Sequence, residues 1–127
     1  MDKKFYIRKN NMDKKFYISL EAAKLLKEKG YNEETDCTID YTGAIWFGEY
    51  RDDCDFPCIT KAEAMDWLEG KGWNFSIMFA DNNLYEYIVY FANEYISVHE
   101  HISGYRETML EAQDAAIITV LEKLEKL

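Results

Sequence analysis

The residues with the clearest chemical potential are three cysteines and two histidines. Cys54 and Cys58 are four positions apart, Cys37 lies upstream, and His99 and His101 alternate on a short segment. Zinc prefers thiolate and imidazole ligands, but structural zinc sites usually bring two cysteines together on one tight turn, which this spacing does not. We therefore predict no metal site and keep Cys37, Cys54 and Cys58 only as a weak zinc candidate. The competing interpretation is that the cysteines fill small apolar spaces.

The same side chains form no recognisable catalytic motif. A cysteine nucleophile needs a histidine base, and neither Cys54 nor Cys58 lies in a sequence typical of a nucleophile elbow or an oxyanion hole. The six glycines stand singly, so the chain has neither a phosphate-binding loop nor a dinucleotide fingerprint. The sequence therefore favours a non-enzymatic role without a cofactor.

Aromatic residues make up 16% of the chain, and many of them alternate with other residues after position 73. Tyr and Trp are enriched at recognition surfaces because they combine a rigid ring with a polar tip. If helices cover one face of a sheet, the other carries either Met78, Ile88 and Tyr90 or the pair Tyr85 and Tyr87, depending on register. The competing interpretation is that the tyrosines pack at the sheet rim with hydrated hydroxyls. The candidate binding residues on this aromatic sheet face are Tyr85, Tyr87, Tyr90, Tyr95, His99 and His101.

The first half of the chain predicts one helix and one hairpin. Ser19 is a good N-cap for a helix over about 20–29, which ends before Gly30. Beyond it, residues 38–41 and 44–50 are rich in β-branched and aromatic types and favour a short hairpin. A charged loop, closed by Pro57, then leads to the second half.

The second half predicts a meander between two helices. Thr60 and Thr108 each stand three residues before a glutamate, which is typical of a capping box at the start of a helix. Between these helices, residues 73–80, 85–92 and 95–102 alternate with period two and are joined by short turns, as in antiparallel strands. We predict an α+β fold of order α-β-β-α-β-β-β-α, in which a meander packs against the helices.

An exact repeat marks the N-terminus, where the segment 1–7 recurs as the segment 12–18. One short duplication cannot form a repeat architecture, since that requires several stacked units. We predict a mobile duplicated arm over residues 1–15 and a single α+β domain over residues 16–127. Whether Met1 or Met12 is the native start stays open.

Charge is distributed unevenly along the chain, whose net charge is −9. Residues 1–29 hold nine Lys and Arg against four Asp and Glu, which leaves six against twenty in residues 30–127. An acidic body repels phosphates, so direct nucleic-acid binding is disfavoured. The sequence has no apolar run long enough for a membrane span and no evident export signal. Its three cysteines cannot complete a disulfide framework, which favours a reducing compartment. We therefore expect a cytoplasmic protein.

Three sets of residues carry a resemblance. They are the segment Ser19 to Tyr31, the helix with Ala64, Trp67-Leu68 and Lys71, and Leu110-Glu111-Ala112 at the start of the last helix. In these features the chain resembles small uncharacterised proteins encoded by phages and mobile elements of gut bacteria. That group has no established activity, so the resemblance implies an accessory protein and transfers no catalytic or binding residue.

Taken together, these features lead us to expect a module that binds a protein partner or a second copy of itself. Two alternatives stay open. In the first, the aromatic residues line a pocket and the protein sequesters a small planar molecule. In the second, the acidic body mimics a nucleic acid and occupies a basic site on another protein.

Overall fold

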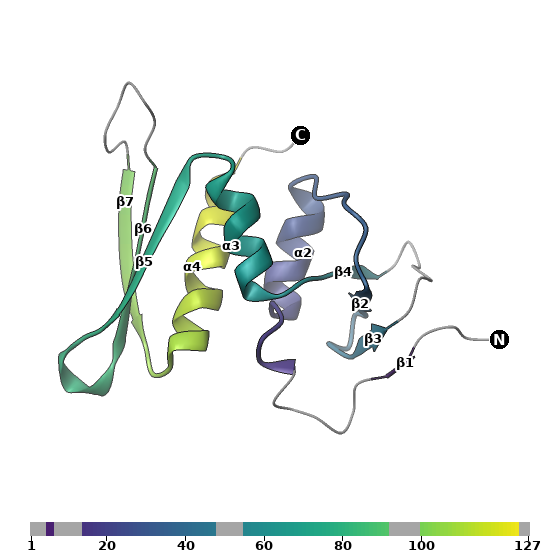
Figure 1. Cartoon of the computed structure of the whole chain (residues 1–127), viewed down its shortest axis with the longest axis horizontal. Helices are drawn as coiled ribbons and strands as arrows, with labels where there is room; N and C mark the ends of the chain where they lie inside the picture. The colour runs from purple at the N-terminus through teal and green to yellow at the C-terminus, as the bar shows by residue number, and fades with distance from the viewer. Residues whose placement is uncertain (1–4, 7–13, 48–54, 92–99, 125–127) are drawn as a thin grey trace. The chain divides into compact units, whose positions relative to one another are not determined.

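The computed structural model describes residues 5–6, 14–47, 55–91 and 100–124 (Figure 1). Three α-helices and seven strands follow one another in the order β1-α2-β2-β3-β4-α3-β5-β6-β7-α4 within these ranges. This is the predicted α+β class. The chain divides into two compact units, unit 1 with residues 1–60 and 124–127, and unit 2 with residues 61–123. The mobile arm over 1–15 and the single domain over 16–127 stay predictions.

The sheet of unit 1 is antiparallel and has the strand order β1-β3-β2-β4. The hairpin of β2 (Cys37–Ile39) and β3 (Ile45–Phe47) confirms the prediction in a shorter form. β1 (Phe5–Tyr6) pairs with β3 at one side. At the other side, β4 (Phe56–Cys58) pairs with β2, so the prediction of a loop through Pro57 is wrong there. Pro57 fits because β4 is an edge strand, where a missing backbone N–H is tolerated.

Helix α2 (Leu20–Glu28) begins and ends where its sequence signals indicate. The Ala22 amide donates to Ser19 Oγ at 3.2 Å, and Gly30 follows the helix with a φ of 94°, a conformation that favours glycine. The buried face of α2 carries Ala22, Ala23 and Leu26, and the helix packs against β4.

The sheet of unit 2 is the predicted antiparallel meander, with the strand order β5-β6-β7. β5 (Trp73–Phe79) and β6 (Tyr85–Phe91) are joined by a tight turn in which Asn82 and Asn83 have positive φ, a conformation that asparagine tolerates. β7 (Glu100–Arg106) ends later than the predicted strand at 95–102, whose first residues lie outside the described ones.

Helices α3 (Lys61–Glu69) and α4 (Met109–Lys123) lie on one side of this meander (Figure 1). α3 begins directly after Thr60, as predicted. At α4, the Glu111 amide donates to Thr108 Oγ1 at 3.1 Å, and the Thr108 hydroxyl donates to the Glu111 carboxylate at 3.1 Å. The core of unit 2 lies between the helices and the sheet and consists of Ala64, Leu68, Trp73, Tyr87, Val89, Ala112, Ala116, Ile117, Val120 and Leu121.

Candidate functional site

The register of the meander decides which tyrosines share a face. Tyr87 lies opposite Ile77 of β5 and Gly104 of β7, whereas Tyr90 lies opposite Asn74 and His101. Successive side chains of a strand point to opposite faces, so Tyr87 and Tyr90 are on different sides of the sheet. Tyr87 is 7% exposed and its neighbour Val89 is fully buried, which identifies their side as the one that α3 and α4 cover.

The opposite side of the meander is the candidate site, and we call it the open face. None of its described side chains is buried, and Met78 and Tyr105 are 47% and 52% exposed. Position 101 joins this face by register, although the structure does not describe its side chain. The open face consists of Asn74, Ser76 and Met78 of β5, Glu86, Ile88 and Tyr90 of β6, and Ser103 and Tyr105 of β7.

The candidate residues from the sequence are therefore separated. Tyr90 lies on the open face, so of the two sets considered, the one with Met78 and Ile88 is uncovered. Tyr85 and Tyr87 lie on the helix-covered face and do not form one surface with Tyr90, because the helices cover the odd-numbered positions of β6. Tyr95 and His99 lie outside the described residues.

Tyr87 has a packing role that its type alone does not reveal. A Cβ atom added at Gly104 would lie 2.6 Å from Cζ of Tyr87, so the Tyr87 ring occupies the space above this glycine. The Arg106 guanidinium lies 5.6 Å from the centroid of the same ring, within range of a cation–π contact. The Tyr87 ring therefore packs over β7 on the helix-covered side of the meander.

Tyr105 is a site residue that the sequence reasoning missed. The sequence pattern predicts a third strand that ends at residue 102, whereas β7 continues to Arg106 and so includes Tyr105. The register puts Tyr105 opposite Glu86, which in turn lies opposite Met78. Extending the period-two pattern through Ser103 to Tyr105 would have revealed it.

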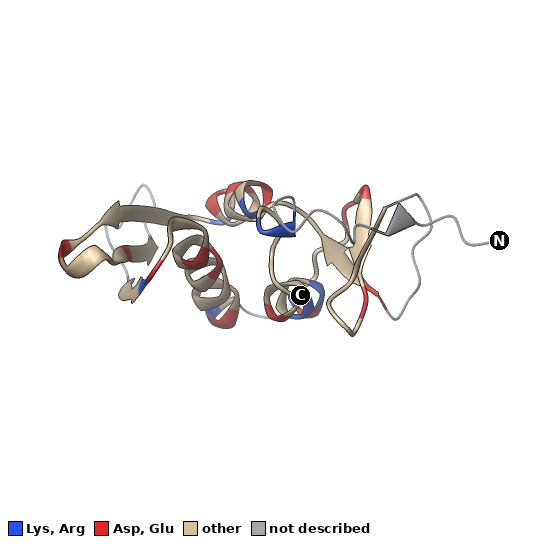
Figure 2. Cartoon of the chain, turned by 90° about the horizontal axis from the view of Figure 1, so that it is seen from below, with Lys and Arg blue, Asp and Glu red and all other residues tan. Residues whose placement is uncertain are grey.

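The strands carry few charges compared with the helices (Figure 2). β5 has no charged residue, β6 has Glu86 alone, and β7 has Glu100 and Arg106 at its two ends. The open face therefore presents mainly apolar and hydroxyl side chains, and its hydroxyl groups would need hydrogen-bond partners in any contact that buries them.

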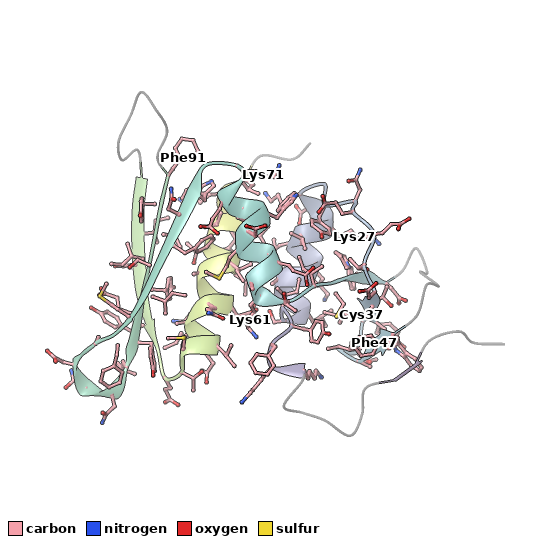
Figure 3. All side chains as sticks on the ribbon, viewed as in Figure 1. Lys27, Cys37, Phe47, Lys61, Lys71 and Phe91 are labelled. Atoms are coloured by element: carbon pink, nitrogen blue, oxygen red, sulfur yellow. The ribbon has the colours of Figure 1, made fainter. Side chains whose placement is uncertain are left out.

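Two of the three cysteines lie in the core of unit 1. Cys37 (Figure 3) pairs with Cys58 across β2 and β4. Each side chain is 2% exposed, and Cys37 Sγ donates to the Cys58 carbonyl oxygen at 3.0 Å. Cys54 lies outside the described residues. Within the described part of the chain, no three His, Cys, Asp or Glu side chains gather closely enough to hold a metal ion.

Lys61 is a buried titratable group that sequence patterns did not reveal. It is 7% exposed at the start of α3 (Figure 3). Burial disfavours the ammonium form and lowers the pKa of Lys61 from its ordinary value, while the Asp114 carboxylate on α4 opposes that shift. A lysine beside a helix cap is usually a surface residue, so no local signal predicts this burial.

Comparison with known proteins gives no match to a family model, a curated protein or a solved structure. None of the described helices combines the length and the apolar content that crossing a bilayer requires. The chain's own surfaces, and above all the open face, therefore carry the evidence for its function.

Proposed function

We propose that this protein is a non-enzymatic binding module that holds a protein partner on the open face. The observation that carries the proposal is the exposure of Met78 and Tyr105 beside half-buried Ile88 and Tyr90 on one face of a sheet. Burying these side chains against another protein would remove apolar surface from water, at about 25 cal/mol per Å². Tyr90 and Tyr105 would add rigid contact area with hydroxyls for hydrogen bonds.

The chemistry of the face specifies the partner's surface. Glu86 lies between Met78 and Tyr105 across the strands, so the face places one carboxylate among apolar and aromatic groups. The chain's net charge of −9 also favours a basic partner. We therefore expect an apolar patch with a basic side chain that reaches Glu86.

The proposed setting of this function is drawn from the sequence. The resemblance to accessory proteins of phages and mobile elements supports a target in the bacterial host. The odd number of cysteines, which cannot all pair within one chain, supports a reducing cytoplasm.

The test is affinity capture from bacterial lysate with three forms of the full chain, namely wild type, Tyr90→Ser and Tyr41→Ser. Tyr90 is on the central strand of the open face, while Tyr41 lies in unit 1 and is 77% exposed. We expect a protein that is captured by wild type and Tyr41→Ser and is lost with Tyr90→Ser. A partner retained equally by all three forms, or no captured partner, would contradict the proposal.

A further inference from the structure

Strand β7 is an edge of the meander, because the strand order β5-β6-β7 leaves it with one strand neighbour among the described residues. An edge strand presents backbone donors and acceptors to another strand. Arg106 Nη1 donates to the Tyr105 carbonyl oxygen at 2.6 Å, so one acceptor of β7 already takes a hydrogen bond from outside the sheet ladder. A partner strand would take the place of this side-chain donor and would pair with the other backbone groups along the edge.

The sequence of β7 is complementary to itself when read in the opposite direction. Suppose that the β7 strands of two copies pair antiparallel with Ser103 of one copy opposite Ser103 of the other. Position 100 of each copy then lies opposite position 106 of the other, so a glutamate meets an arginine at both ends of the paired strands. Opposite charges directly across an antiparallel pair stabilise it. Shifting the register by two residues puts Arg106 opposite Ile102, or Glu100 opposite Gly104, and removes both ion pairs. A shift by one residue would set helix-covered positions against open-face positions.

The shapes of the central positions also match in this register. Ile102 of one copy would lie opposite Gly104 of the other, where the Tyr87 ring covers the glycine on the helix side. Ile102 is only half-buried in the single chain, so this contact would remove further apolar surface from water. On the other side, exposed Tyr105 would lie opposite position 101 of the second copy.

We propose that the chain forms a two-fold dimer in which the β7 strands of two copies pair antiparallel about Ser103, with Glu100 of each copy opposite Arg106 of the other. This goes beyond the proposed function, because the contact is the edge strand β7 and not the open face, and it names a second copy of the chain as a further protein partner. The two meanders become one six-stranded sheet, since each copy contributes three strands. The open faces of the two copies lie on the same side of this sheet. The dimer therefore offers another protein a surface made of two adjacent open faces.

The decisive experiment exchanges charges at the two ends of β7. Arg106→Glu sets a carboxylate against a carboxylate in each of the two contacts, and Glu100→Arg sets a guanidinium against a guanidinium, so each variant alone repels itself. We expect self-association of each variant to weaken by about tenfold or more, because two contacts change in every dimer. Mixing the two variants restores both opposite-charge pairs, and sedimentation velocity should then detect a heterodimer.

A Lys14→Glu variant is the matched control, because it changes the net charge as Arg106→Glu does, at an exposed position of unit 1. It should dimerise like wild type. Sedimentation velocity of the wild-type chain is repeated at increasing protein concentrations. A wild-type chain that stays monomeric at every concentration, or a mixture of Arg106→Glu and Glu100→Arg that does not associate, would overturn the proposed dimer.

Cross-linking identifies the strand that forms the contact. In a Cys54→Ser background, with Cys37 and Cys58 buried, Ser103→Cys should form an intermolecular disulfide across the two-fold axis on mild oxidation. Ser76→Cys, at the centre of the other edge strand β5, is the control. Cross-linking through Ser76→Cys alone would overturn the assignment to β7. Neither result depends on Tyr90→Ser, so this dimer and the open-face proposal can fail separately.

Discussion

The central strands of the two sheets differ in how many of their faces are buried. β2 lies between β3 and β4, and all three of its residues are buried. β6 lies between β5 and β7, and buried Tyr87 and Val89 alternate with half-exposed neighbours. A strand buried on both faces must satisfy any polar side chain internally, whereas a strand buried on one face can expose the other for binding. Unit 2 therefore supplies the candidate surface.

The largest expected difference in stability is between substitutions of two adjacent residues, Val89 and Ile88, which lie on opposite faces of β6. Val89→Ser should lower the free energy of unfolding by about 3–5 kcal/mol, because it removes buried apolar surface and introduces a buried hydroxyl. Ile88→Ser should lower it by about 1 kcal/mol or less, because Ile88 lies on the open face. Urea unfolding of both variants measures the difference. Equal losses would mean that the meander is covered on both sides.

A smaller effect should distinguish β2 from β6. Thr38 is 2% exposed, and its hydroxyl donates to Oδ2 of buried Asp55 at 3.3 Å. Thr38→Val keeps the shape but removes this donor, and should lower the free energy of unfolding by about 1–2 kcal/mol. Thr42→Val, in the next turn, removes an exposed hydroxyl that donates to Asp40 Oδ1, so it compares the loss of a solvated hydrogen bond with the loss of a buried one. If Thr38→Val is neutral, the second face of β2 does not depend on its polar contact.

The smallest effect concerns the turn between β2 and β3. Burial raises the pKa of Asp40, but hydrogen bonds from Thr42, Trp46 and Ala44 outweigh it, so the pKa lies below the ordinary value of 3.8. Because the folded-state pKa is lowered, the carboxylate stabilises the fold above the unfolded-state pKa, and this contribution is lost as the pH falls through the folded-state value.

Asp40→Asn tests this pH dependence. The substitution weakens the acceptor of Trp46 Nε1, which donates to Asp40 Oδ2 at 2.8 Å, and urea unfolding of both proteins measures their free energies of unfolding. Between neutral pH and about pH 3, wild type should lose more free energy of unfolding than the variant, by at most about 1 kcal/mol, because pH 3 lies less than one unit below the ordinary pKa of Asp. If acid lowers the free energy of unfolding equally in wild type and in Asp40→Asn, Asp40 is not responsible for this pH dependence.

Much of the fold could be predicted because its signals are local. Ser19 and Thr108 begin helices through hydrogen bonds to amides three residues away, and such spacing is visible in the sequence. The period-two alternation over 73–91 likewise predicted β5 and β6. β4 was missed because Pro57 argues against a strand unless its position at a sheet edge is known.

The candidate site could be predicted only in part. Alternation already separates Tyr87 from Tyr90, but it does not say which of them the helices cover. That choice depends on α4 packing against β6 from about twenty positions further along the chain, and on the register that puts Gly104 opposite Tyr87.

The sequence by itself determined the types of the elements, because helix propensity, strand propensity and capping act between residues close together in the chain. It also determined the acidic balance and the excess of aromatic side chains, because these are sums over the composition. Only the tertiary structure decided which rings are enclosed and which are exposed. A side chain's burial depends on contacts between segments far apart in the chain, and no local pattern encodes those contacts.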